Sequence, residues 1–201
     1  MLSEYKTALP LKTANDAETE AKSLLEAAQK KMGFVPNMYQ AMANSTGLLN
    51  TYMQGYDAFR ANSKFSPTEQ EVILLAISRT NGCEYCVAAH SFLAGAMSGV
   101  PDAVTTAIRD GAPVPDIKLN ALSNFSQLMV TKRGLPDRVD VEAFLSAGYE
   151  EKDILEIILA IAVKTISNYT NHIFHTEVDE VFTKHTWSEP QHMDETLAIN
   201  Q

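Results

Sequence analysis

The stretch SPTEQEVILLAISRTNGCEYCVAAH, residues 66–90, decides the fold of this chain. Ser66–Glu69 combines a serine cap, a proline at the first helical position and a glutamate placed to close a capping box, so a helix begins there. That helix ends at Asn81-Gly82, because both residues tolerate the left-handed conformation common at helix ends. A second helix begins close to Cys83. The stretch therefore predicts a hairpin of two helices.

The rest of the chain has the same helical period. Apolar residues recur every three or four positions, and no alternating run of β-branched residues between turns predicts a strand. We expect an all-α, single-domain multi-helix bundle. The expected helices cover residues 16–32, 38–43, 48–61, 67–80, 83–97, 101–110, 116–132, 140–147 and 150–182. The last is long for a compact domain, so we expect a break at residues 167–171, where the sequence SNYTN favours helix weakly.

Length and composition predict one folded domain. The chain has 201 residues, of which 45% are hydrophobic and 20% charged, as in average globular proteins. We assign residues 1–186 to the helical domain. Residues 187–201 are polar and without periodicity, and we expect them to form a C-terminal tail.

The charge pattern excludes several partners. The formal charge is -9, and lysines and arginines are scattered, so we expect no nucleic-acid partner. The N-terminus is acidic where a signal peptide is apolar. The longest apolar stretch, residues 154–163, contains Glu156 and is about half a membrane span, so we expect no membrane partner and a cytoplasmic location.

The only two cysteines of the chain are Cys83 and Cys86. In a reducing cytosol, such a close pair indicates catalysis or metal binding rather than a structural disulfide. On a helix Cys83 and Cys86 are neighbours, and so are Cys86 and His90. The helix start and the imidazole both favour the reactive thiolate.

Glu71 and His90 can meet if the two helices fold back on each other at Gly82, since each lies a similar distance from the turn. Cys83, at the turn, is too far along the axis to touch Glu71. This geometry predicts a relay from Glu71 through His90 to Cys86. Cys86 is then the base-assisted nucleophile and Cys83 its disulfide partner.

Glu71, Cys83, Cys86 and His90, separated by eleven, two and three residues, resemble the active-site motif of the alkylhydroperoxidase D and carboxymuconolactone decarboxylase superfamily. GFVPN at 33–37 resembles the entry motif of that family, and NYTNH at 168–172 resembles the C-terminal segment of its peroxidase-related branch. The resemblance spans roughly residues 30–182.

The resemblance implies a thiol-dependent peroxidase or disulfide oxidoreductase with antioxidant activity, with Glu71, Cys83, Cys86 and His90 as its catalytic set. It also implies a hydroperoxide substrate, an external dithiol or thioredoxin-like reductant, and a homo-oligomer, a trimer or hexamer. Alkylhydroperoxidase D itself has histidine where this chain has Tyr85, and a tyrosine with a pKa near 10 is no base at neutral pH.

Three alternatives stay open. The two thiols, His90 and Glu71 could bind zinc in a non-catalytic helical protein. The decarboxylase branch does not rely on a cysteine pair, which argues against that activity. His172 and His175 precede Glu177 and could bind a metal, although helix-end or interface roles suit them better. No cofactor motif is present, so we expect no bound cofactor and an external reductant.

Overall fold

The computed structural model describes residues 3–189, and this part of the chain contains helices, turns and loops but no strand. The all-α prediction is confirmed. None of the described helices is both long and apolar enough to cross a membrane. The elements are α1 (Thr19–Met32), α2 (Asn37–Met42), α3 (Thr46–Asn62), α4 (Pro67–Thr80), α5 (Glu84–Ala96), α6 (Asp102–Asp110), α7 (Ile117–Thr131), α8 (Arg138–Ser146), α9 (Glu151–Phe174) and the 3-10 helix η1 (Glu180–His185).

The predicted hairpin is formed by α4 and α5. Ser66 Oγ accepts a hydrogen bond from the Glu69 backbone N–H at 3.3 Å, and the Glu69 carboxylate accepts one from the Ser66 N–H at 2.9 Å, which completes the capping box. Gly82 has a φ of 66°. Its N–H donates to Arg79 O, and the Cys83 N–H donates to Ser78 O at 3.0 Å, the pattern of a Schellman helix end.

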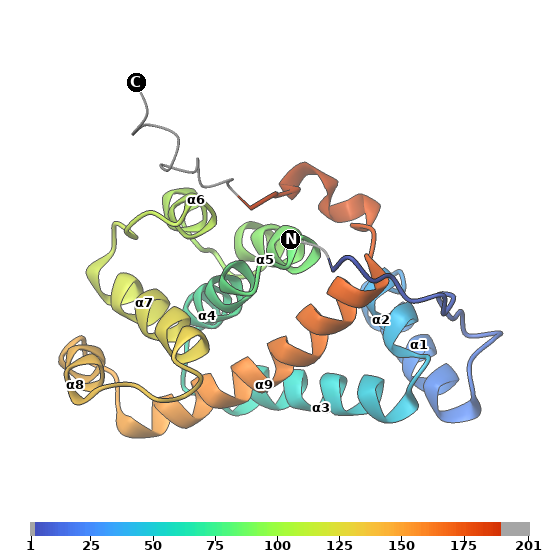
Figure 1. Ribbon diagram of the computed structural model, residues 1–201, viewed down its shortest axis with the longest axis horizontal. Coiled ribbons are helices and arrows are strands. Elements are labelled where there is room, and N and C mark those ends of the chain that lie inside the picture. The colour runs from blue at the N-terminus through green and yellow to red at the C-terminus, as the bar shows by residue number, and fades with distance from the viewer. Residues whose placement is uncertain (1–2, 190–201) are drawn as a thin grey trace, which may run out of the picture.

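The α4–α5 hairpin lies at the centre of the bundle (Figure 1). α4 packs against α5, α6, α7 and α9, while α9 also packs along α3 and reaches α2. In Figure 1, α7 and α8 lie at one end of the molecule and α1 and α2 at the other, with α9 running between the two ends. α9 therefore carries side chains into both parts of the interior.

The predicted break at residues 167–171 is wrong, because α9 is continuous from Glu151 to Phe174. Ser167 and Thr170 each donate their hydroxyl to a backbone carbonyl of the preceding turn, at 3.2 and 2.8 Å. Asn168 and Asn171 are buried, at 0% and 2% exposure. These polar residues face the interior, so their weak intrinsic helix propensity is overridden by tertiary contacts.

The predicted tail starts at Trp187, but this residue packs into the domain. Its side chain is 8% exposed, and the indole Nε1–H donates to Arg109 O at 3.0 Å. The Arg109 guanidinium in turn donates to the backbone carbonyls of His185 and Thr186. The chain is thus held at least as far as Trp187, and residues 190–201 of the predicted tail lie outside the described part.

Candidate active site

Cys83 and Cys86 lie together at the start of α5. Cys83 is the N-cap residue of this helix, and Cys86 follows within its first turn. Both are free thiols, with side chains only 1% and 2% exposed. Each thiol alters the ionisation of the other. The structure therefore shows a reduced, adjacent and fully buried dithiol.

Glu71 and His90 meet across the hairpin as predicted. His90 Nδ1 lies 2.9 Å from Glu71 Oε2, and both side chains are almost fully buried. The other carboxylate oxygen of Glu71 accepts a hydrogen bond from the Arg60 guanidinium on α3. Sequence reasoning missed Arg60, which neutralises the buried charge of Glu71.

Lys164 on α9 occupies the place that the predicted relay gave to Cys86. Its side chain is 0% exposed, and Nζ lies 2.9 Å from His90 Nε2. Both nitrogens of His90 therefore have partners, Glu71 on one side and Lys164 on the other. Among residues 3–189, no hydrogen bond joins His90 to Cys86. The direct transfer of the Cys86 proton to His90 stays a prediction, and the structure places the Lys164 amine next to that nitrogen.

Two further side chains of α9 reach the sulfurs. Asn171 Nδ2 lies 3.3 Å from Cys86 Sγ and 3.7 Å from Cys83 Sγ. Ser167 Oγ lies 3.8 Å from Cys86 Sγ. The other amide atom of Asn171, Oδ1, is buried without a hydrogen-bond partner within the described residues. An amide donor thus faces both sulfurs, and a free acceptor lies beside it.

The two thiols have unequal acidity. Burial opposes ionisation of Cys86, but the hydrogen bond from Cys83 and the nearby Lys164 charge hold the pKa of the Cys86 thiol well below its ordinary value of 9.0. Burial raises the pKa of Cys83 well above that value, and the hydrogen bond to Cys86 adds to the rise. Cys86 is therefore the thiol that ionises more readily, and Cys83 is the one that keeps its proton.

The histidine between the charges is neutral. Burial and then the Lys164 charge lower the pKa of His90 below its ordinary 6.5. Burial alone would raise the pKa of Glu71, but His90 and Arg60 hold it below 4.5. Glu71 is therefore ionised at neutral pH. His90 donates Nδ1–H to this carboxylate, and its Nε2 accepts a hydrogen bond from the Lys164 amine.

Tyr85 is not suited to act as a base. Its hydroxyl donates to Asp179 Oδ2 at 2.5 Å, and burial together with this carboxylate raises the pKa of Tyr85 well above 10.0. Asp179 also accepts hydrogen bonds from the backbone N–H of Asn37, at 3.1 and 3.4 Å. Tyr85 thus ties α5 to the segment before η1 and to α2.

The described part of the chain contains no set of metal ligands at either of the two sites considered above, the cysteine pair and the histidines of α9. Within residues 3–189, no group of three or more His, Cys, Asp and Glu side chains is arranged to hold a metal ion. His172 stacks on Tyr169 at a centroid distance of 6.3 Å. His175 ends α9 and its Nε2 lies 2.7 Å from Ser3 O. These histidines occupy the helix-end positions favoured above.

A sequence signal for Lys164 existed. Ile157 and Ala160 form the apolar buried stripe of α9, and the same stripe continues one turn at a time through Lys164, Ser167 and Asn171. A helical stripe that becomes polar without leaving the buried face indicates a polar site. Because a helix break was predicted at residues 167–171, the stripe was not followed through Lys164, Ser167 and Asn171.

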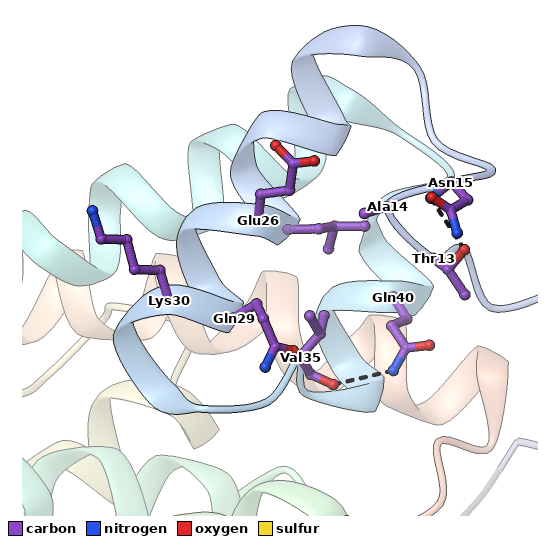
Figure 2. Close-up of a pocket in the computed structure, with 9 residues that line it drawn as sticks. Thr13, Ala14, Asn15, Glu26, Gln29, Lys30, Val35 and Gln40 are labelled. Carbon is purple, nitrogen blue, oxygen red and sulfur yellow. Dashed lines mark hydrogen bonds between the residues drawn. The ribbon is translucent and has the colours of Figure 1, made fainter.

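The described part of the chain also has a cavity of about 530 Å³ between the N-terminal segment, α1 and α2 (Figure 2). Its lining residues are Thr13, Ala14, Asn15, Leu25, Glu26, Gln29, Lys30, Val35 and Gln40. Leu25 and Val35 belong to the same apolar cluster as the cysteines, but no sulfur lines the cavity. The thiol chemistry, rather than this cavity, defines the candidate site.

Comparisons with known proteins agree with the motif. Residues 47–126 match the model of the carboxymuconolactone decarboxylase family, and this range contains Glu71, Cys83, Cys86 and His90. No curated protein matches the sequence at a significant level.

Three crystal structures share the fold over most of the chain. A peroxidase-related protein from Ralstonia eutropha JMP134 with an alkylhydroperoxidase AhpD core has a TM-score of 0.77 at 21% identity, covering 90% of this chain and 96% of that one. A peroxidase-related protein from Silicibacter sp. TM1040 has a TM-score of 0.73 at 25% identity, covering 90% and 97%. A cysteine-to-alanine variant of the debrominase Bmp8, in complex with 2,3,4-tribromopyrrole, has a TM-score of 0.71 at 17% identity, covering 89% and 95%. The resemblance stated from the motif is confirmed.

Proposed function

We propose that this member of the alkylhydroperoxidase D-like and carboxymuconolactone decarboxylase superfamily is a thiol-dependent hydroperoxidase, with Cys86 as nucleophile and Cys83 as its disulfide partner. The observation that carries the proposal is a pair of buried free thiols that face one amide donor, Asn171 Nδ2, at 3.7 and 3.3 Å. Two adjacent free thiols have pKa values shifted in opposite directions, Cys86 down and Cys83 up. A thiolate next to a protonated thiol is what a two-cysteine peroxide cycle requires.

The cycle begins with attack of the Cys86 thiolate on the terminal oxygen of a hydroperoxide. The O–O bond breaks, Cys86 becomes a sulfenic acid, and the alkoxide leaves as an alcohol after taking a proton. Cys83 then condenses with the sulfenic acid, which forms the disulfide and releases water. The amide of Asn171 supports both steps, because its N–H faces both sulfurs.

Asn171 also has the acceptor that a hydroperoxide needs. Its buried Oδ1, without a partner within residues 3–189, can accept the O–H of the peroxide while Nδ2 donates to an oxygen or to sulfur. Leaving such an acceptor buried and unpaired costs about 1–3 kcal/mol. Binding of a peroxide would remove that cost, which favours this substrate over an apolar one.

The reductant is an external dithiol, either a small molecule or a thioredoxin-like protein. It attacks the Cys83–Cys86 disulfide by thiol–disulfide exchange and restores the reduced pair. No second cysteine pair exists in the chain that could do so internally, since Cys83 and Cys86 are its only cysteines. Together these steps give an antioxidant cycle.

We also keep the prediction of a homo-oligomer. The outward face of α9 carries large apolar side chains at helical spacing that no described residue covers. They are Leu155, Ile158, Tyr169 and Ile173, which are 43–66% exposed. A second copy of the chain is the expected cover. A solution mass of 22.1 kDa by light scattering at micromolar concentration would contradict this prediction.

A peroxide-consumption assay tests the proposed function, with dihydrolipoamide, thioredoxin and glutathione compared as reductants. We expect turnover with at least one dithiol and none after Cys86→Ser. Lack of turnover with all three would reject the peroxidase. Bromide release from 2,3,4-tribromopyrrole without peroxide turnover would instead assign a debromination, since one structural neighbour is a debrominase.

A further inference from the structure

Lys164 is a buried cation without a carboxylate partner. Its side chain is 0% exposed, and its amine lies 2.9 Å from the uncharged side of His90. Within residues 3–189, Lys164 forms no ion pair with Asp or Glu. Glu71, the nearest acid through His90, is already neutralised by Arg60. A fully buried lysine needs a compensating anion or must give up its proton.

The compensating anion is the Cys86 thiolate. Cys86 faces the same side of α9 as Lys164, because Ser167 and Asn171, one and two turns further along that side, approach its sulfur at 3.8 and 3.3 Å. The Lys164 charge lowers the pKa of the Cys86 thiol. With Glu71 paired to Arg60, His90 neutral, and Lys164 paired to Cys86, the buried cluster has no net charge.

The groups that face this pair come from several helices. They are Cys83, Tyr85, Cys86 and His90 of α5, Glu71 of α4, Arg60 and Tyr52 of α3, and His172 of α9. Of these, only Cys86 is an anion that a positive Lys164 can neutralise, because Glu71 already has its partner and Tyr52 keeps its proton through burial.

We propose that Lys164, rather than an imidazolium at His90, holds Cys86 as a thiolate and donates the proton that the leaving oxygen requires. His90 is then a positioning residue: Glu71 fixes its Nδ1–H, and its Nε2 fixes the Lys164 amine. The second part rests on the proposed peroxidase function. In that step the thiolate and ammonium react with the hydroperoxide to give sulfenic acid, alcohol and a neutral amine, so atoms and charge balance.

Alkylation of Cys86 by iodoacetamide tests the first part without any peroxide. In the full chain with Cys83→Ser, the pH midpoint of Cys86 labelling is measured by mass spectrometry for Lys164→Met, Lys164→Arg, His90→Gln and Lys152→Met. Lys152 is an exposed lysine of the same helix and serves as the matched control.

We expect Lys164→Met to move the midpoint toward that of a free thiol, about 8.5, and to slow labelling at pH 7 by about tenfold or more. Lys164→Arg and Lys152→Met should keep a low midpoint, and His90→Gln should move it less than Lys164→Met. If His90→Gln moves the midpoint most while Lys164→Met leaves it low, the imidazolium relay is right and this inference is overturned. Should Lys164→Met fail to fold by circular dichroism, a midpoint that stays low in His90→Gln supports the inference and a free-thiol midpoint there overturns it.

Oxidation of Cys86 at high pH tests the proton donation. Above the labelling midpoint of both proteins, Cys86 is ionised with or without Lys164, so any remaining difference comes from the leaving oxygen. We expect single-turnover oxidation by an alkyl hydroperoxide to be about tenfold slower in Lys164→Met. Equal rates would reject the proton donation alone. A Lys164-dependent labelling midpoint in a protein that never reacts with peroxide would reject the proposed function and retain the thiolate assignment.

Discussion

The two halves of α9, before and after about residue 162, both bury one face of the helix. The buried side chains are apolar in the first half and largely polar in the second. Ile157 and Ala160 of the first half are 0% exposed and pack into an apolar cluster that contains the stacked rings of Phe125 and Phe144, at a centroid distance of 4.3 Å. Lys164 and Ser167 of the second half are also 0% exposed but lie beside the thiols. Apolar burial stabilises a fold, whereas polar burial costs free energy unless every group finds a partner. Stability is therefore concentrated in the first half and chemistry in the second.

The largest expected effect belongs to the apolar half. Ile157→Ala removes a fully buried side chain, and the transfer and cavity terms together should lower the free energy of unfolding by about 2–5 kcal/mol. The labelling midpoint of Cys86 should stay unchanged in the folded variant. Urea denaturation and iodoacetamide labelling measure both. A shifted midpoint would mean that the two halves are not separable.

Glu71→Gln tests the charged network that the second half of α9 joins, because Glu71 on α4 contacts His90 and His90 contacts Lys164. It leaves the Arg60 guanidinium without its anion, and since Arg60 is partly exposed, we expect a loss of about 2–3 kcal/mol, at or below the lower end for a broken buried ion pair. A relay through imidazolium predicts that this variant raises the Cys86 midpoint. Pairing with Lys164 predicts no rise, because removing a negative charge does not disfavour a thiolate. Labelling of the Cys83→Ser protein with and without Glu71→Gln distinguishes the two.

The polar half should make stability depend on pH. The folded-state pKa of His90 is lowered below 6.5, so the unfolded chain binds more protons in the window that extends downward from pH 6.5. Stability therefore falls as pH drops through that window. His172, whose pKa burial also lowers, contributes in the same direction.

His90→Gln should accordingly reduce the loss of stability with falling pH but not remove it, because His172 still contributes. Urea midpoints measured between pH 7.5 and about pH 5, above the ordinary carboxylate range, report the slope. His172→Gln is the matched comparison and should remove only its own share. An unchanged slope in His90→Gln would show that this imidazole is not held neutral in the folded protein.

The smallest effect is expected for Tyr85→Phe. The variant loses the hydrogen bond to Asp179, which should lower the free energy of unfolding by about 1 kcal/mol. The rate of Cys86 oxidation by peroxide should change by less than about twofold, because Tyr85 contacts a carboxylate and not the nucleophile. A large loss of rate at constant stability would assign Tyr85 to the chemistry after all.

Local signals in the sequence were sufficient for much of this architecture. The capping box at Ser66 and the helix end at Gly82 define the hairpin, and the hairpin alone brings Glu71 to His90. Lys164 and Arg60 could not be paired with the site in this way. They lie on α9 and α3, whose placement against the hairpin depends on long-range packing rather than on the spacing of residues along one helix.

The same limit explains the error at Ser167–Asn171. Intrinsic propensity argues against helix in this segment, while burial against α5 and the contacts of Asn171 with both sulfurs favour it. The segment is helical because these tertiary contacts outweigh its weak intrinsic propensity, and they are the contacts of the candidate site. A segment in which local preference fails while the structure stays ordered is a useful pointer to function.

The central claim is that Cys86, not Cys83, reacts with peroxide. Dimedone trapping after one equivalent of hydroperoxide tests it most directly, in Cys83→Ser and Cys86→Ser proteins whose folding is checked by circular dichroism. We expect a dimedone adduct on Cys86 in the first protein and little on Cys83 in the second, because burial raises the pKa of the Cys83 thiol and keeps it protonated. Labelling of Cys83 with none on Cys86 would contradict the account.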